Sequence, residues 1–131
     1  MLRRGIIVDT PDGFNTGVIS QQQAALTPAA GTLAAQGAKI LAQGACVSCH
    51  GIVGVNLKSA DDPRAAGLIG PNLTHFGSRN LIAGGVLPND PAHLAEWLSN
   101  PQAVKPGSDM PNLGLSQDQI NALVAYLESL K

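Results

Sequence analysis

Apolar residues recur with helical spacing in three stretches of the chain, all of them after residue 30. The first stretch begins after Thr32, whose hydroxyl is suited to cap a helix, and runs toward two cysteines at positions 46 and 49. The apolar positions that share one face of this helix are Leu33, Gly37, Ile40 and Leu41. The pattern therefore predicts a helix with the cysteine pair at its end.

Two further helices are predicted nearer the C-terminus. Asp90 followed by Pro91 favours a helix start, because proline is tolerated at the first helical position, and Pro101 must end that helix. Ser116 and Gln119 have the spacing of a capping box, which predicts the start of the last helix. The apolar stripes of these helices are Leu94, Trp97 and Leu98, and then Ile120, Leu123, Val124 and Leu127. Three helices separated by loops indicate an all-α domain.

The first thirty residues show no helical period. We interpret residues 1–30 as a tail and linker that precede a domain of residues 31–131. In this tail, residues 5–9 favour a short strand and residues 11–13 a turn, and polar, alanine-rich residues follow. No apolar run is long enough for the core of a signal peptide or for a membrane helix.

The composition changes this picture in one respect. The 131 residues suit one domain, and 15 glycines and 9 prolines favour short helices joined by long loops, such as residues 51–88. Only four residues are aromatic, although aromatic rings normally supply much of a core: Phe14, Phe76, Trp97 and Tyr126. Such a chain buries little apolar surface unless a large apolar group is added. The net charge of −1, with charges scattered, argues against nucleic-acid binding.

The two cysteines and the histidine after them form the pattern C-x-x-C-H, in Cys46, Cys49 and His50. This pattern is typical of covalent attachment of a c-type haem. Two thiols on one helical turn can each add to a vinyl group of the porphyrin, and the adjacent imidazole then lies under the ring, beside the iron. The motif therefore predicts one haem c, covalently bound through both cysteines, with His50 as an iron ligand.

Three other interpretations of the cysteine pair fit less well. A thioredoxin-like redox pair normally follows a strand in a βαβ fold, and the sequence indicates neither. A structural zinc site needs four ligands, usually from two such pairs, and the chain has only 2 cysteines. A disulfide across two intervening residues would be strained and would close almost no loop.

The second axial position of the iron has four candidate ligands: Met110, His75, His93 and Met1. Met110 is favoured, because it lies in a loop, before a proline and ahead of the last helix. His75 is expected on the same side of the ring as His50, and His93 falls in the first turn of a helix, where a histidine is usually a surface residue. Ligation by histidine and methionine raises the reduction potential and closes the iron, which indicates electron transfer rather than oxygen or peroxide chemistry.

From residue 37 to residue 131 the chain resembles a class I cytochrome c, and in more detail the cytochrome c domain fused to the C-terminus of subunit II in caa-type haem–copper oxidases. The stretches that carry the resemblance are CVSCHG (46–51), GPNLTHFGSR (70–79), AGGVLPND (83–90), LAEWLSNPQAVKPGSDMP (94–111) and LSQDQINALVAYLESLK (115–131). The resemblance implies a class I cytochrome c fold, in which short helices and long loops wrap around one haem.

The first 23 residues, MLRRGIIVDTPDGFNTGVISQQQ, resemble the last strand and exit segment of the copper-binding domain in the same subunit. In that family a methionine ligand of the dinuclear copper centre comes just before this strand, where Met1 stands. The chain lacks the copper-binding cysteine pair and histidines, so it does not bind that centre by itself. Gly17 also stands where the family has a tryptophan.

The resemblance also implies roles for residues outside the cysteine motif. The carbonyl of Pro71, or of its neighbour, would accept a hydrogen bond from the other ring nitrogen of His50. Trp97 and Arg79 would donate hydrogen bonds to the haem propionates. Gly37 and Tyr126 would mark the crossing of the first and last helices.

As a whole, the resemblance implies an electron-transfer domain that is not an enzyme on its own but part of a subunit of cytochrome c oxidase. It would accept an electron from a small periplasmic donor and pass it to the copper centre of the terminal oxidase in aerobic respiration. Because haem c is attached outside the cytoplasm, we expect a fragment of an exported, membrane-anchored chain, periplasmic or on the outer face of the cytoplasmic membrane. Two alternatives stay open: a free-standing soluble c-type cytochrome, and a haem enzyme or gas sensor with an open sixth site.

The distribution of lysines bears on how the donor docks. The stretches expected to border the haem edge are residues 45–47, 52–55 and 110–113, and none contains a lysine. The four lysines are spread along the chain: Lys39, Lys58, Lys105 and Lys131. We therefore expect a small apolar patch, rather than a ring of basic charge, to receive the donor.

Overall fold

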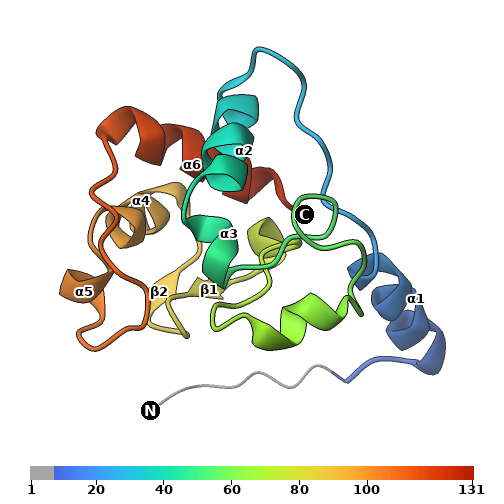
Figure 1. Cartoon of the computed structure of the whole chain (residues 1–131). Coiled ribbons are helices and arrows are strands. Elements are labelled where there is room, and N and C mark those ends of the chain that lie inside the picture. Colours follow the sequence, from blue (N-terminus) through green and yellow to red (C-terminus); the bar gives the residue numbers. More distant parts are fainter. Residues whose placement is uncertain (1–7) are drawn as a thin grey trace.

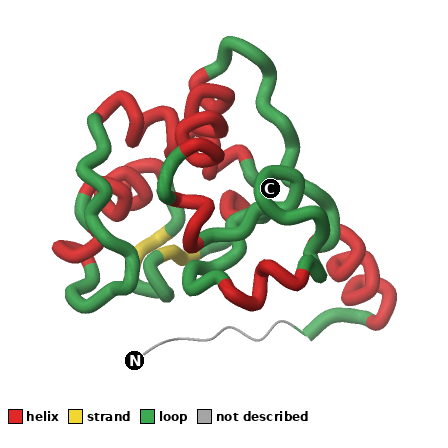
Figure 2. Tube along the Cα trace, in the orientation of Figure 1, coloured by secondary structure: helices red, strands yellow, loops and turns green. Residues whose placement is uncertain are grey.

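The computed structural model describes residues 8–131 (Figure 1). Short helices and long loops make up nearly all of this part of the chain, and two very short strands form a hairpin (Figure 2). The α-helices are α1 (Pro11–Gln21), α2 (Leu33–Gln43), α3 (Cys46–Cys49), α4 (Pro91–Ser99), α5 (Pro101–Val104) and α6 (Gln117–Ser129). The other elements are the 3₁₀-helices η1 (Pro63–Gly67) and η2 (Phe76–Ser78) and the strands β1 (Leu81–Ile82) and β2 (Leu87–Pro88). The prediction of an all-α domain is confirmed.

The three predicted helices are present, and their N-terminal caps are the predicted ones. The side chain of Thr32 accepts a hydrogen bond at the start of α2, and that of Asp90 does so at the start of α4. Ser116 and Gln119 exchange both hydrogen bonds of a capping box at the start of α6. Of the four positions expected on one face of α2, Leu33 is exposed, because it lies in the first turn of the helix.

The centre of the fold is the crossing of α2 over α6, and Figure 1 shows the two helices lying against each other. A Cβ atom added to Gly37 of α2 would lie 1.9 Å from the carbonyl oxygen of Ala122 and 2.8 Å from Cβ of Tyr126, both in α6. Only glycine permits this close approach, and the crossing lies at Gly37 and Tyr126, as the resemblance implied. The ring of Tyr126 is buried at the contact, and burial raises the pKa of its hydroxyl.

Replacement of Gly37 by alanine is expected to destabilise the haem-loaded domain by about 2–3 kcal/mol, because the new methyl group forces the two helices apart. Urea unfolding followed by circular dichroism measures the change. Gly17→Ala in α1 is the matched control, since its added Cβ would meet nothing within 4 Å. If Gly37→Ala unfolds at the same urea concentration as Gly17→Ala, the crossing does not depend on glycine.

Residues 51–88 contain more structure than the sequence predicted. Strands β1 and β2 pair antiparallel, with Ile82 opposite Leu87, and η1 and η2 interrupt the loops before them. The chain turns between the strands through Ala83, Gly84 and Gly85, all with positive φ. Two-residue strands give no alternating pattern over the 4–8 residues from which strands are predicted, so the sequence did not reveal the hairpin.

The tail differs most from its prediction. A turn was expected at residues 11–13, but residues 11–21 form α1, which is capped by the side chain of Thr10 and begins with Pro11. None of the residues of α1 is buried, so the sequence shows no apolar stripe from which this helix could be predicted. The strand expected over residues 5–9 lies largely outside the described residues, as does Met1, and Val8 and Asp9 are not in a strand.

After α1 the linker returns to the body of the domain. The amide of Ala25 donates a hydrogen bond of 3.0 Å to the carbonyl of Val53, and a ring nitrogen of His75 lies 3.3 Å from the carbonyl oxygen of Gln21. The core beneath is built mainly from aliphatic side chains of α2, α4 and α6, with Phe76 and Tyr126. Within residues 8–131, no helix has both the length and the apolar character required to cross a membrane.

Candidate functional site

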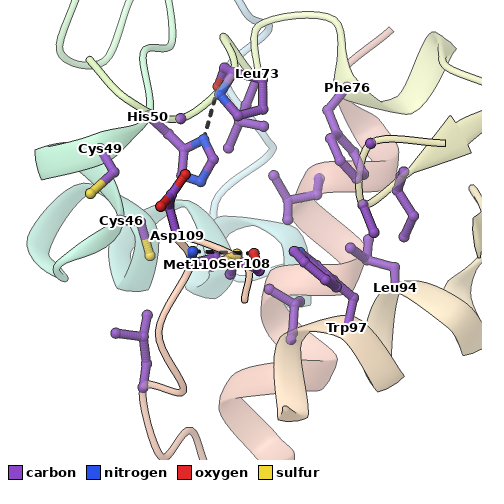
Figure 3. A pocket seen from close by; sticks show the side chains of 18 of the residues that line it. Cys46, Cys49, His50, Leu73, Phe76, Leu94, Trp97, Ser108, Asp109 and Met110 are labelled. Carbon is purple, nitrogen blue, oxygen red and sulfur yellow. Dashed lines mark hydrogen bonds between the residues drawn. The ribbon is translucent and has the colours of Figure 1, made fainter. Parts of the chain in front are cut away.

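A cavity of about 540 Å³ opens into the core beside α3. This volume is within the range of roughly 300–1,000 Å³ that is usual for ligand sites. Figure 3 shows Cys46, Cys49 and His50 on one side of the cavity and Phe76, Leu94 and Trp97 on the other, with the loop of Ser108 and Met110 below. Apolar side chains form much of the wall: Leu73, Phe76, Leu94, Leu98, Leu123 and Leu127. The core is therefore hollow where a small all-α domain would normally be packed.

The two cysteines lie on the single turn of α3 and both line the cavity. They are free and half-buried, so they are not joined to each other. Burial raises the pKa of the Cys46 thiol, with a smaller contribution in the same direction from Cys49. Within residues 8–131, no three His, Cys, Asp or Glu side chains gather as a zinc site would require. The structure thus presents both thiols toward an apolar space, as covalent attachment of a porphyrin requires.

His50 follows α3 directly, and its ring is held from one side. Its Nδ1 lies 2.8 Å from the carbonyl oxygen of Pro71, drawn as a dashed line in Figure 3. A carbonyl only accepts, so Nδ1 carries the proton and Nε2 keeps its lone pair for a metal. The amide of Gly70 donates to the carbonyl of Cys49 at 2.8 Å, and the amide of Leu73 donates to that of Gly51 at 2.7 Å. Residues 70–73 are therefore hydrogen-bonded to the residue before the histidine and to the residue after it.

Asn56 fixes the backbone beneath the same histidine, and sequence reasoning missed it. Its side-chain amide donates to the carbonyls of His50 (2.8 Å) and Val47 (3.2 Å), and its oxygen accepts from the amide of Ile52 at 2.8 Å. These bonds join the turn of α3 to the loop that follows it. No motif marks a single asparagine in a loop, so the sequence held no signal for it.

Of the three candidates for a second iron ligand that lie within residues 8–131, only Met110 lines the cavity. It lines the wall from the loop before α6. Nδ1 of His75 faces the carbonyl oxygen of Lys131 at 2.9 Å, and Nδ1 of His93 lies 2.7 Å from a carboxylate oxygen of Asp90. Both histidines are absent from the described wall of the cavity, and Met1 is outside the described residues.

Trp97 and Arg79 also line the cavity, together with Lys105, which sequence reasoning did not select. The guanidinium of Arg79 donates to the carbonyl of Asn72 and lies over the ring of Phe76. Burial lowers its pKa, and no carboxylate of residues 8–131 forms an ion pair with it. A Cβ added to Gly84 would lie 2.9 Å from Nζ of Lys105, so this ammonium group is near the hairpin turn. Two cations and an indole thus border the cavity without a paired carboxylate.

One expectation about the rim was wrong. Residues 52–55 were expected to border the haem edge, but they do not line the cavity. Ile52 and Val53 are buried in the core, where the amide of Val53 donates to the hydroxyl of Thr74 at 2.9 Å. The large hydrophobic residues that are exposed at the cavity are Ile69 and Leu81, whose exposed fractions are 72% and 46%.

The residues present fit a haem c. A large planar group needs an apolar slot, and its carboxylates need donors at one edge; the cavity supplies both. The histidine is held closely as well, because a Cβ added to Gly70 would lie 2.6 Å from Nδ1 and Cε1 of His50. The backbone at Gly70 therefore packs directly against the imidazole. Cys46 and Cys49 would attach the porphyrin, and His50 and Met110 would bind the iron.

Comparison with known proteins agrees with this geometry. The family model of cytochrome c matches residues 34–131. Cytochrome c oxidase subunit 2 of Alkalihalophilus pseudofirmus is 37% identical over 101 residues, which cover 76% of this chain and 26% of that protein. The subunit 2 proteins of Bacillus subtilis (38% over 101 residues) and Bacillus sp. strain PS3 (34% over 122 residues) cover 76% and 92% of this chain, and 27% and 32% of their own lengths.

The chain thus spans about a quarter to a third of the length of these relatives. The family model covers most of the described residues, from the first turn of α2 to the end of the chain, and it includes the whole wall of the cavity. The arrangement of short helices and loops around one cavity is that of a class I cytochrome c. The chain belongs to the cytochrome c family.

Proposed function

We propose that the domain is a monohaem electron carrier whose iron is bound by His50 and Met110. The observation that carries this proposal is that His50, with Nδ1 committed to Pro71, and Met110 line one apolar cavity from two different segments. When bound, the haem supplies an iron centre that takes up and releases one electron. Two protein ligands leave no free site on the iron, so the protein acts as a carrier and not as a peroxide or gas-binding protein.

The side chains around the cavity would set the properties of this centre. The apolar wall excludes water, and the thioether of Met110 favours the reduced iron, so both raise the reduction potential. Arg79, Trp97 and Lys105 would donate to the propionates, whose burial is otherwise costly. The carbonyl of Pro71 keeps the imidazole in one tautomer and increases its basicity.

The electron path is proposed from the relatives, which are named cytochrome c oxidase subunit 2. In this proposal the domain belongs to such a subunit and passes its electron to the dinuclear copper centre of the same subunit. The match to the Bacillus sp. strain PS3 protein covers 92% of the chain, so it extends into the tail before residue 31 and supports a covalent link to that subunit. Attachment of haem c takes place outside the cytoplasm, so the domain would lie at the outer face of the cytoplasmic membrane.

The donor would be a small periplasmic protein that docks on the apolar side of the cavity mouth. Ile69 is exposed there, as is Leu81, and the described wall of the cavity carries one aspartate, Asp109, against Arg79 and Lys105. No large excess of one charge is present to steer a partner from a distance. Docking should therefore depend on apolar contact.

Stopped-flow reduction of the haem-loaded domain by its native donor tests this docking. We expect the second-order rate to change by less than about threefold between ~10 mM and ~300 mM salt, because apolar docking is nearly indifferent to ionic strength. Ile69→Ser should lower the rate several-fold, whereas Leu26→Ser, at an exposed leucine in the linker, should leave it unchanged. A rate that falls tenfold or more with salt would mean that charge steers the donor.

A further inference from the structure

Gln102, in the short helix α5, binds the loop that carries Met110. Its side-chain nitrogen donates to the carbonyl of Ser108 at 2.7 Å and to that of Met110 at 2.8 Å. Its side-chain oxygen accepts from the amide of Gly107 at 3.3 Å. One amide group therefore makes three hydrogen bonds to the backbone of residues 107–110.

Only a carboxamide can make this set of bonds. Two of the partners are carbonyl oxygens, which need N–H donors, and the third is an N–H group, which needs an acceptor. Glutamate has no donors when ionised, and leucine has neither donor nor acceptor. A loop that carries Gly107, which has a φ of +80°, and no regular secondary structure has few other bonds to keep its shape.

The residues next to Gln102 in α5 are held in place by burial and by a helix cap. Pro101 is fully buried at the first position of α5, and the side chain of Asn100 caps the helix by accepting from the amide of Ala103. Gln102 itself is half-buried between α5 and the loop. The amide thus projects from an ordered turn, so its bonds can transmit the position of that turn to Met110.

We propose that Gln102 is a positioning residue for the second axial ligand. It fixes the backbone on both sides of Asp109 in the shape that holds the thioether of Met110 at the cavity. Its bonds would oppose movement of this loop, and so would keep the thioether of Met110 where it can bind the iron. This inference rests on the proposed ligation by Met110.

The test uses the haem-loaded domain and three variants: Gln102→Leu, Gln102→Glu and the control Gln117→Leu. Gln117 is an exposed glutamine at the start of α6, and its amide donates to the side chain of Asn121 in the same helix. The readout is the binding of added imidazole to the oxidised protein, followed by loss of the weak long-wavelength sulfur-to-iron band. Imidazole binds only after the sulfur has left the iron, so its apparent affinity reports how easily the loop opens.

We expect Gln102→Leu to bind imidazole at least tenfold more tightly than wild type, a change of about 1.4 kcal/mol in the opening equilibrium. Gln102→Glu should bind imidazole more tightly still at neutral pH, because its carboxylate would face two carbonyl oxygens and repel the loop. Gln117→Leu should bind imidazole with the affinity of wild type. Gln102→Glu keeps the size of the side chain, so it decides the question if Gln102→Leu does not fold. If both Gln102 variants bind imidazole with an affinity within twofold of wild type, Gln102 does not position Met110.

A wrong role for Gln102 can be distinguished from a wrong assignment of Met110 as an iron ligand. If wild type shows the sulfur-to-iron band and the Gln102 variants keep wild-type imidazole affinity, ligation by Met110 stands and the role of Gln102 is wrong. If wild type lacks the band, ligation by Met110 is itself wrong, and so is the positioning role of Gln102.

Discussion

Replacing both Cys46 and Cys49 by alanine is expected to leave the chain largely unfolded when it is expressed with the haem-attachment machinery. Without covalent attachment, the apolar cavity of about 540 Å³ has nothing to fill it. At ~24 cal/mol per Å³, an empty cavity of this size would cost on the order of 10 kcal/mol as an upper bound. Whole domains are stable by only about 5–15 kcal/mol, so the loss is comparable to the total.

Far-ultraviolet circular dichroism and a thermal melt measure this outcome. Ser48→Ala is the matched control, because Ser48 lies on the same turn of α3, is exposed, and leaves both thiols in place. The control should bind haem and melt cooperatively, whereas the double variant should show little helix and no cooperative melt. A cooperative melt with native helix content in the haem-free double variant would show that the fold does not need the cofactor.

Met110→Ala should have the second largest effect, on the iron rather than on the fold. We expect the haem to stay attached through the cysteines, the reduction potential to fall by on the order of 100 mV, and the reduced protein to bind carbon monoxide. The potential falls because the thioether favours the reduced iron and water, which takes its place, does not. Redox titration and the spectrum of the reduced protein under carbon monoxide measure the two effects.

Leu113→Ala is the control for this variant, since Leu113 lines the same cavity from the same loop and carries no sulfur. It should keep the sulfur-to-iron band and exclude carbon monoxide. Retention of the band in Met110→Ala would assign the sulfur ligand to another residue. Ready carbon monoxide binding by wild type would instead favour an enzyme or sensor with an open iron.

The helices that build the core were predictable because their signals are local. Thr32, Asp90 and Ser116 cap the residues that follow them within one turn, and behind each cap buried residues recur four positions apart. The cysteine motif is local as well, since Cys46 and Cys49 share one turn. Each of these signals depends on characteristic residue types only three or four positions apart.

The remaining features depend on contacts that the sequence does not display. Asn56 and Gln102 act through backbone groups up to nine positions away, and any loop asparagine or glutamine looks the same in the sequence. Lys105 reaches the hairpin turn at Gly84 only because the fold brings the two together. Helix α1 has a cap and a first-turn proline but no buried face, so its apolar pattern gave no periodic signal.

The central claim is that this cavity holds one covalent haem with its iron closed by His50 and Met110. An optical spectrum of the purified protein, recorded oxidised, reduced and reduced under carbon monoxide, tests it most directly. We expect haem that stays with the chain after denaturation and solvent extraction, a weak long-wavelength sulfur-to-iron band in the oxidised form, and a reduced spectrum that carbon monoxide does not change. Extractable haem, or a missing sulfur band with ready carbon monoxide binding, would contradict the claim.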